Sequence, residues 1–249
     1  MNRAYIAVLD SGVGGLSVLT ELIKEFPNRQ FLYLGDNGNA PYGRKSRREL
    51  LSLAIKNVNV LKEYNVEAIV LGCNTLSVNV ISDIKDYSGL PVFGVFPPVE
   101  KYLSEGKKVL LLATERTAEK YRGVKNLHAV GLKNLVKDIE NNLFNLSAVN
   151  FEKNLLESVG EFVDKKGYYD TVILGCTHYV FLKNKISDHF CPKNLTSGNI
   201  FAVEKLKKYL SNKKSLVNYS GFELKFVGEW AKTNEKFYVL GGQNTLKIR

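Results

Sequence analysis

Cysteine is scarce in this sequence: only three of the 249 residues are Cys, namely Cys73, Cys176 and Cys191. Such an odd, sparse set is not a disulfide framework. It suits a protein of the reducing cytosol, so we expect a cytoplasmic location. A zinc site is also disfavoured, because Cys176-Thr-His178 offers only two candidate ligands, with no CxxC and no second histidine pair nearby. We therefore expect neither a disulfide nor a resident metal.

Long apolar runs are absent as well. No stretch approaches the roughly 20 apolar residues that a membrane-spanning helix needs. The apolar segment near the start, in MNRAYIAVLDSGVGG, is too short for the core of a signal peptide. Apolar residues make up 45% of the chain and charged residues 24%, as in ordinary soluble globular proteins. The sequence therefore predicts no association with a membrane.

Acidic residues are in the minority, since 25 Asp and Glu stand against 35 Lys and Arg, for a net charge of +10. Basic residues cluster in GRKSRRE (43–49) and LKKYLSNKK (206–214), but no nucleic-acid-binding motif accompanies them. The clusters therefore indicate solvated helix faces and a positive field that attracts anionic ligands. No nucleic-acid partner is expected.

Short β-branched runs alternate with longer helical stretches along most of the chain. Continuous apolar runs suit strands that are covered on both faces, as in parallel sheets. Strand and helix repeated in this way predict an α/β fold with open, mostly parallel sheets. The predicted strands are 4–9, 30–34, 67–71, 92–95, 108–113, 127–130 and 171–174, and the predicted helices are 14–26, 46–64, 75–87, 132–143, 150–166 and 199–211.

The chain also nearly repeats itself. IAVLDS (6–11) and VLLLAT (109–114) each read as a strand, a small hydroxyl residue and then a helix, and a strand ending in Leu-Gly-Cys follows in each half. This pattern predicts two similar lobes, with VFPPVEKYLSEG (95–106) as the hinge between them. The predicted lobes are 1–96 plus 207–249, which carries Cys73, and 97–206, which carries Cys176. The short alternating pieces FELKFV and KFYVL near the end are given no placement.

Cys73 and Cys176 stand just past two predicted strands, in IVLGCNTL and VILGCTHY. In open α/β sheets, ligands gather beyond the carboxyl ends of the strands. Each cysteine also precedes a predicted helix, which we expect Thr75 and Thr177 to cap. A helix N-terminus favours a thiolate and lowers its pKa from about 8.5 toward neutrality, where it suits proton transfer. Cysteine is also a common small core residue, but its recurrence in two similar halves favours the chemical role.

Two proton-transfer groups that face each other across a cleft suggest inversion of a stereocentre. One group removes a proton from one face of a carbon, and the other returns a proton to the opposite face. The Cα–H bond of an amino acid is a very weak acid, so the developing carbanion needs preorganised donors around its carboxylate. The backbone N–H groups near Asn74 and Thr75, and near Thr177 and His178, can supply them.

The segment LDSGVGGLS (9–17) follows the first strand and allows a rival interpretation. A dinucleotide fingerprint would need glycine where Ser17 stands, although Asp36 could still act as the ribose-binding acid. A nicotinamide enzyme of this type would leave the cysteine pair unexplained. Alternatively, Asp10 lies at the mouth of the cleft, where it binds an ammonium group or steers a cysteine proton, or it caps the first helix.

Other polar residues are candidates for the same site. GDNGNAPYGRKS (35–46) is a loop in which Tyr42 and Gly43 could present a hydroxyl and an N–H to a ligand, or form an ordinary surface turn. His178, two residues after Cys176, could be a general acid or base, could hold the ionisation state of that cysteine, or could be structural. Cys191 is interpreted as structural because it is not at a strand end.

Five motifs in order, DSGVGG, YLGD, PYG, GCNT and GCTHY, together resemble the glutamate racemases of the cofactor-independent aspartate/glutamate racemase superfamily. The resemblance implies two α/β lobes with the active site between them, racemisation of L- and D-glutamate for peptidoglycan, no cofactor or metal, and frequently a homodimer. It implies Cys73 and Cys176 as the acid/base pair, assisted by Asp10 and His178. The implied substrate contacts are Asp10, Ser11, Pro41, Tyr42, Gly43, Asn74, Thr75, Thr114, Thr117, Thr177 and His178.

Asp36 and Glu140 are the implied supporting residues, and Glu140, in LVKDIEN, corresponds to the family's glutamate near the histidine. The sequence departs from the family pattern at Leu76, Val180 and Thr196, none of which is a catalytic group. Three alternatives stay open: an aspartate racemase of the same superfamily, the nicotinamide-dependent enzyme, and a catalytically idle binding protein of this fold.

Overall fold

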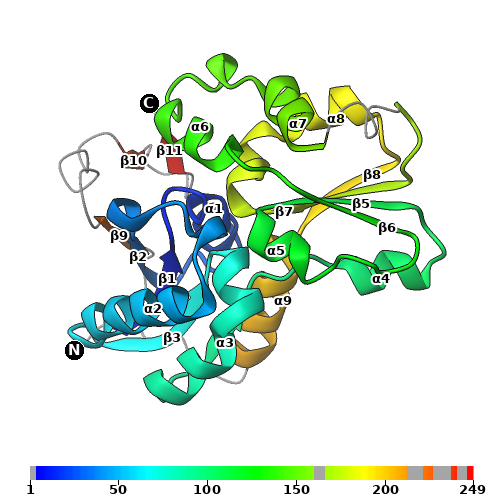
Figure 1. Ribbon diagram of the computed structural model, residues 1–249. Coiled ribbons are helices and arrows are strands. Elements are labelled where there is room, and N and C mark those ends of the chain that lie inside the picture. Colours follow the sequence, from blue (N-terminus) through cyan, green and yellow to red (C-terminus); the bar gives the residue numbers. More distant parts are fainter. Residues whose placement is uncertain (1–3, 160–165, 212–220, 227–236, 240–245, 249) are drawn as a thin grey trace.

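Two parallel sheets, each flanked by helices, form most of the described part of the chain (Figure 1). The structure, a computed structural model, describes residues 4–159, 166–211, 221–226, 237–239 and 246–248. Two lobes therefore stand side by side, and the predicted α/β fold with two mostly parallel-sheet lobes is confirmed. Among the described residues, no helix has the length and apolar character needed to cross a bilayer.

The first sheet has five parallel strands in the order β4-β3-β1-β2-β9. Its strands are β1 (Tyr5–Asp10), β2 (Gln30–Gly35), β3 (Val66–Leu71), β4 (Val92–Gly94) and β9 (Gly221–Phe226). The segment FELKFV, which the sequence left without a place, therefore forms most of an edge strand parallel to β2. Part of KFYVL forms β10 (Phe237–Val239), which pairs antiparallel with β11 (Leu246–Ile248).

Helices cover both faces of the first sheet, and the alternation of side chains along β1 explains why. Ile6 and Val8 pack in one apolar cluster with Leu19, whereas Ala7 and Leu9 pack in another cluster on the opposite face. All four β1 residues are fully buried, as expected for a central parallel strand. The surrounding helices are α1 (Leu16–Glu25), α2 (Arg47–Lys62), α3 (Asn74–Ser88) and α9 (Asn199–Leu210).

The second sheet has four parallel strands in the order β6-β5-β7-β8. They are β5 (Val109–Ala113), β6 (Leu127–Gly131), β7 (Thr171–Gly175) and β8 (Asn194–Ser197), with helices α4 (Val99–Ser104), α5 (Glu115–Glu119), α6 (Leu135–Asn141), α7 (Phe151–Val159) and α8 (Lys183–Phe190). The sequence did not predict β8, α4 or α8, whereas α5 follows VLLLAT as the repeat predicted. β8 is a four-residue edge strand with one apolar side chain, and α8 buries only Ile186 and Phe190, so both patterns are weak.

Two stretches of chain join the lobes. The first is the segment Phe96–Pro97–Pro98 after β4, as predicted for the hinge, and the second is the turn at Gly198 between β8 and α9. These stretches touch, because a Cβ added at Gly198 would collide with the carbonyl oxygen of Phe96. Only glycine lets the two backbones approach so closely. The two connections between the lobes therefore lie close together.

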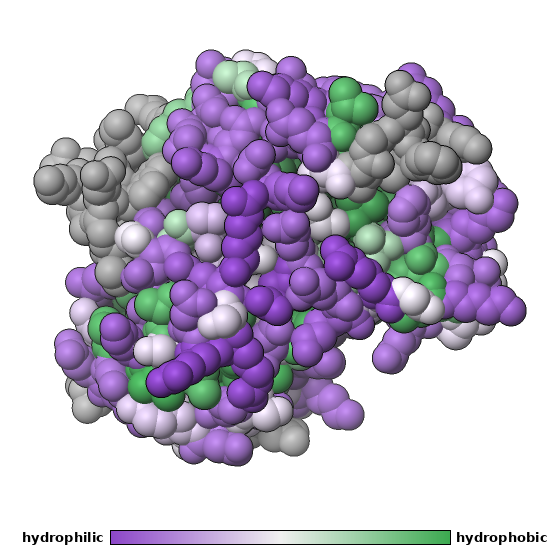
Figure 2. All heavy atoms as spheres, in the orientation of Figure 1, coloured by the Kyte–Doolittle hydropathy of each residue, from purple (hydrophilic) through white to green (hydrophobic). Residues whose placement is uncertain are grey.

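Hydrophilic residues dominate the face of the molecule shown in Figure 2, including the zone across its middle where the lobes of Figure 1 meet. Apolar residues form only small scattered patches on this face. The basic cluster 43–49 is only partly a solvated surface, because Arg44 bonds across to the second lobe. Its Nη2 lies 3.0 Å from the carbonyl oxygen of Lys133 and 3.1 Å from Oδ1 of Asn134.

Candidate functional site

The carboxyl ends of β3 and β7 bring the two cysteines to one small cavity between the lobes. Cys73 follows β3 and is the N-cap of α3, and Cys176 follows β7 and is the N-cap of the 3-10 helix η5 (Thr177–Leu182). The cavity volume is ≈ 10 Å³, about the minimum for one water molecule. Its lining residues are Ser11, Pro41, Tyr42, Gly43, Cys73, Asn74, Thr75, Thr114, Val136, Cys176, Thr177 and His178.

Thr75 and Thr177 do not cap these helices, contrary to the sequence prediction. α3 begins at Asn74, and neither helix start has a side-chain cap. The cysteines themselves occupy the N-cap positions. For Cys73, this places the sulfur within hydrogen-bonding reach of the Leu76 N–H at the start of α3.

Cys73 is 5% exposed and lies against the first lobe's glycine-rich turn. Its Sγ is 3.8 Å from Oγ of Ser11. Burial raises the pKa of Cys73 to about 12, and the charges of Asp10 and Cys176 add to this, against a lowering effect of the Leu76 N–H. The predicted fall of this pKa toward neutrality is therefore wrong, because desolvation outweighs the helix N-terminus. Cys73 is a thiol at neutral pH.

Cys176 has a different environment, since its Sγ lies 3.8 Å from Nδ1 of His178. Nε2 of the same histidine lies 2.6 Å from Oε1 of Glu140. Burial alone would lower the pKa of His178, but its contacts with Cys176 and Glu140 outweigh burial and raise that pKa well above its ordinary value. His178 is thus an imidazolium that donates one N–H to Glu140 and directs the other at Cys176.

Asp10 lies behind the cavity wall rather than at its mouth. The carboxylate is fully buried and accepts the N–H of Gly12 at 2.7 Å and the hydroxyl of Thr177 at 3.4 Å. Burial raises its pKa to about 6, against the opposing charge of His178. Asp10 does not cap α1, which starts six residues later at Leu16 with Gly15 as its N-cap. Its carboxylate acts instead within the turn between β1 and α1.

Asp36 fixes the position of Tyr42. The Tyr42 hydroxyl donates to Oδ2 of Asp36, and Nδ2 of Asn57 lies 3.2 Å from both of these oxygens. Burial and then the charge of Asp36 raise the pKa of Tyr42 above its ordinary value. The hydroxyl is therefore used within the protein, and Tyr42 contributes its ring to the cavity wall. Asp36 is itself buried and accepts from Tyr42, Asn57 and Asn39, so its carboxylate is used within the protein.

Three threonines join the lobes at the cavity. Oγ1 of Thr75 lies 3.0 Å from Oγ1 of Thr114 and 3.4 Å from Oγ1 of Thr117. Thr117 itself is fully buried and does not line the cavity. Asn74 donates to the carbonyl oxygen of Val95 at 3.1 Å. Its Oδ1 has no hydrogen-bond partner within the described part of the chain, so an acceptor at the cavity wall stays available to a donor such as an ammonium group.

Two residues at the site were not predicted from the sequence. Val136 lines the cavity from α6, one turn before Glu140, and its position on that predicted helix was the available signal. Asn37, in the 3-10 turn η1 (Asn37–Asn39), donates to Oε2 of Glu140 at 3.0 Å. No sequence pattern indicates this second contact, because it joins residues from different lobes.

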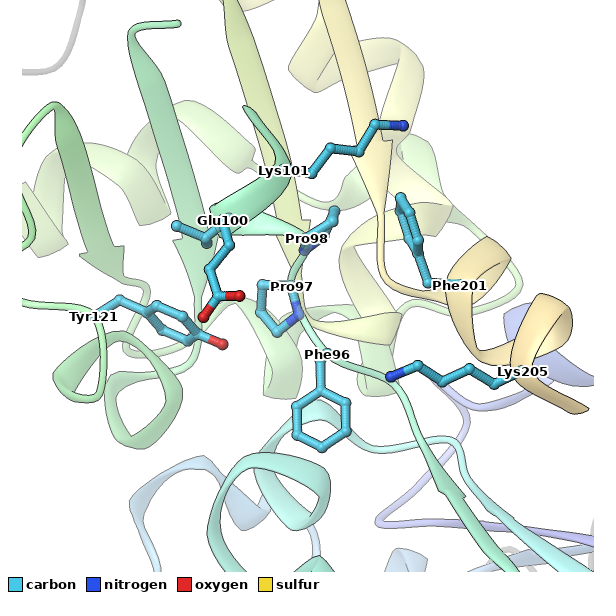
Figure 3. Close-up of a pocket in the computed structure, with 9 residues that line it drawn as sticks. Phe96, Pro97, Pro98, Glu100, Lys101, Tyr121, Phe201 and Lys205 are labelled. Atoms are coloured by element: carbon cyan, nitrogen blue, oxygen red, sulfur yellow. The ribbon is translucent and has the colours of Figure 1, made fainter. Parts of the chain in front are cut away.

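A larger hollow of ≈ 470 Å³ lies beside the hinge, between α4 and α9 (Figure 3). Its lining contains the prolines of the hinge, three aromatic rings, Glu100 and two lysines, without a cysteine or histidine. Proton transfer at a carbon needs groups that titrate near the working pH. The smaller cavity between the cysteines is therefore the candidate active site.

Comparisons with known proteins identify relatives of this chain. A model of the Asp/Glu/Hydantoin racemase family matches residues 32–206. The chain is 35% identical to a glutamate racemase of Clostridium novyi over 87% of both chains. Its fold is similar to the glutamate racemase of Bacillus anthracis, with a TM-score of 0.77, 25% identity and coverage of 95% of this chain and 92% of that one.

A second solved structure is equally similar in fold. It is the glutamate racemase of Escherichia coli in complex with L-glutamate and the activator UDP-MurNAc-Ala. The TM-score is 0.77 at 25% identity, and the match covers 91% of this chain and 90% of that one.

Proposed function

The chain belongs to the Asp/Glu/Hydantoin racemase family, and from that premise we propose that it interconverts L-glutamate and D-glutamate without a cofactor. The observation that carries the proposal is the pair of buried cysteines at one cavity, each at the N-terminus of a helix from a different lobe. The choice of glutamate is supported by curated relatives and solved structures that are glutamate racemases. Racemisation of aspartate is the alternative within the family.

The two cysteines start from opposite protonation states in the proposed mechanism. Cys176 is the thiolate, held beside the His178 imidazolium, and Cys73 is the thiol. Cys176 takes the Cα proton of L-glutamate, and Cys73 gives its own proton to the opposite face of the carbanion. D-glutamate is formed, Cys176 is now a thiol and Cys73 a thiolate. The reverse reaction begins from this second state. The assignment of Cys73 to the D-enantiomer follows the family resemblance.

The carbanion is stabilised in this proposal by helix N-termini. The starts of α3 and η5 line the cavity, and their free N–H groups suit the substrate carboxylate, on which negative charge grows. Oδ1 of Asn74, which has no other partner among the described residues, accepts from the substrate ammonium group. The remaining proposed substrate contacts are Ser11, Pro41, Tyr42, Gly43, Thr75, Thr114, Thr177 and His178.

Four residues act from behind the cavity in the proposal. Glu140 holds His178, Asp36 holds Tyr42, and Thr117 supports Thr114. Asp10 binds Thr177, and its charge keeps the nearby Cys73 protonated until the substrate arrives. Asp10 is thus a positioning residue in this scheme. The sequence resemblance had also placed it in direct contact with substrate.

Substrate entry requires the lobes to separate. A cavity of ≈ 10 Å³ is far smaller than the roughly 300 Å³ or more of typical small-molecule sites. The structure therefore corresponds to a closed state. Closure around the substrate excludes water from the carbanion, and water would otherwise weaken every electrostatic contact in the site.

The wider setting of the reaction is also part of the proposal. D-glutamate would serve peptidoglycan synthesis and the enzyme would be a homodimer, as the family resemblance implies. The cysteine content further suggests a cytoplasmic location, where the cysteines would stay reduced. For the lobe boundaries, α9 packs in the apolar cluster of the first sheet through Ala202, Val203 and Leu206. This packing supports a return of the chain to the first lobe near Gly198, before the predicted residue 207.

A polarimetric assay tests the proposed function. L-glutamate and L-aspartate are each incubated with the protein, with no cofactor added. Loss of optical rotation with glutamate, at a kcat/KM above that for aspartate, is the expected result. A preference for aspartate would make the chain an aspartate racemase. No loss of rotation with either substrate would contradict racemase activity and favour an idle binding protein.

A further inference from the structure

The carboxylate of Glu140 accepts hydrogen bonds from three donors. Oε1 lies 2.6 Å from Nε2 of His178 and 2.9 Å from the backbone N of Val13, and Oε2 lies 3.0 Å from Nδ2 of Asn37. The side chain is only 11% exposed. A buried carboxylate is stable only when its oxygens are paired. Each of these three donors therefore contributes to its orientation and charge.

Two of the three donors come from the opposite lobe. Glu140 and His178 lie on α6 and η5 of the second lobe, whereas Val13 and Asn37 follow β1 and β2 of the first lobe. The first lobe is shaped for this approach, because a Cβ added at Gly12 would collide with Oε1 of Glu140. When the lobes separate to admit substrate, Glu140 keeps His178 and loses both donors of the first lobe.

Asn37 is the only side chain of the first lobe for which the described structure shows a hydrogen bond to Glu140. It does not line the cavity. Its own Oδ1 is buried and has no hydrogen-bond partner within the described residues. The side-chain amide of Asn37 therefore serves as a hydrogen-bond donor to Glu140. Its buried, unpaired oxygen lowers the stability of the folded protein.

We propose that Asn37 is a positioning residue that completes the Glu140–His178 pair, and that it does so only when the two lobes close on each other. The inference rests on the proposed racemase function, because it concerns how closure of the lobes positions His178, the residue beside the proposed base Cys176. Before closure, Glu140 lacks two of its donors and binds the proton of His178 more strongly. After closure, the donors of the first lobe share the negative charge and fix the carboxylate, so that Glu140 holds the His178 imidazolium in place beside Cys176.

The charged and titratable groups around this pair come from several elements. Cys176 lies beside His178 on the same turn, Asp10 acts on both His178 and Glu140 from the end of β1, and Tyr33 of β2 lies within reach of Glu140. Tyr33 donates its hydroxyl to the carbonyl oxygen of Gly12. Of these groups, none replaces the hydrogen bond from Asn37 to Oε2 of Glu140.

The variant Asn37→Asp tests the proposal, because aspartate has the same shape and is a donor only when protonated. At pH 8.5 its ionised carboxylate faces Glu140 and cannot donate, so kcat should fall at least about tenfold, which corresponds to one pK unit. As the pH falls, the carboxyl group gains a proton and donates to Glu140, so the ratio of variant to wild-type kcat should rise. KM should change little. A ratio that stays constant or falls with decreasing pH would overturn the proposal.

The matched control is Asn59→Asp. Asn59 is exposed on α2, and its Oδ1 accepts the hydroxyl of Tyr87 at 2.7 Å, which aspartate can also do. This variant adds the same charge far from Glu140. Its kcat should follow that of the wild type at every pH. A pH-dependent loss of similar size in the control would show that added charge alone causes the effect.

A readout independent of activity separates this inference from the proposed function. Removing a donor from Glu140 strengthens its bond to His178, so Asn37→Ala should raise the pKa of that histidine. NMR titration of the ring can follow this, since the chain has only three histidines. An unchanged or lowered His178 pKa would overturn the inference. If the wild-type protein does not racemise glutamate, the proposed function fails while this measurement still tests the contact.

Discussion

Nε2 of His178 lies 2.6 Å from Oε1 of Glu140, so the histidine beside Cys176 is held by a buried carboxylate. Cys73 has no such partner and lies instead near the carboxylate of Asp10. The two sulfurs thus have opposite electrostatic surroundings although they stand at equivalent places in similar lobes. A cation next to Cys176 and an anion near Cys73 fit the opposite roles that the proposed mechanism gives the two sulfurs.

The substitution Glu140→Gln should neutralise His178. Without the carboxylate, desolvation, the largest influence on this ring, is opposed only by Cys176, so the pKa of His178 should fall. The loss of the imidazolium should lower kcat at least about tenfold at pH 8. NMR titration of the His178 ring measures the predicted fall in its pKa, and kcat measured over a pH series checks the predicted loss of activity.

The control for that experiment is Glu157→Gln, which removes a carboxylate from an exposed pair with Lys153 on α7. Exposed pairs of this kind contribute little to stability. Its kcat should equal that of the wild type. A His178 that remains charged in Glu140→Gln would show that Cys176, and not Glu140, maintains the imidazolium.

Each catalytic cysteine should be indispensable. Cys73→Ser and Cys176→Ser should each lower racemisation in both directions by about 10²-fold or more, the usual contribution of a general acid or base. Cys191→Ser is the matched control, because Cys191 is exposed at the end of α8 and its thiol bonds only to the carbonyl oxygen of Asp188 in the described structure. Near-normal racemisation in Cys73→Ser or in Cys176→Ser would contradict the mechanism in which both sulfurs are required.

The buried carboxylate of Asp10 should lower the free energy of unfolding at neutral pH. Its pKa is about 6 in the folded protein against 3.8 for the ordinary group, so folding requires either proton uptake or burial of the charge. The protonated carboxyl group contributes fully to stability below about pH 4, and this contribution is lost as the pH rises through 6. Asp10→Asn, which keeps an acceptor for the Gly12 N–H, should therefore be more stable than the wild type at pH 8 by up to about 3 kcal/mol.

Urea unfolding at pH 4 and pH 8 measures this difference. The gain in unfolding free energy should be large at pH 8 and small at pH 4, while racemase activity falls because Thr177 loses a charged partner. An equal gain at both pH values would mean that the carboxylate is not destabilised by burial. A stability loss at pH 8 would mean that its hydrogen bonds outweigh desolvation.

The sequence predicted the strands that position the site because each is a short, continuous apolar run. The run TVIL needed no knowledge of distant residues to be assigned to β7, and the cysteine after it followed from the same local pattern. The edge strand β8 was missed because its sequence, NLTS, has a single apolar residue. A local sequence pattern predicts a strand or helix only when enough of its residues are buried and therefore apolar.

Properties that depend on distant contacts were not predictable. The pKa of Cys73 is set by the depth of its burial and by Asp10, 63 positions earlier in the chain, so the helix N-terminus alone gave the wrong sign. Asn37 and Glu140 are separated by 103 positions and meet only across the lobe interface. A single sequence contains no local signal for such a pair.

The central claim is that one cysteine acts on each face of Cα, and the most direct measurement is racemisation of L-glutamate in D2O at low conversion. The account predicts that the D-glutamate formed carries deuterium at Cα, while the remaining L-glutamate still carries protium. Deuterium that enters the remaining L-glutamate as fast as D-glutamate forms, or protium retained in the product, would contradict it, because a single base would then serve both faces.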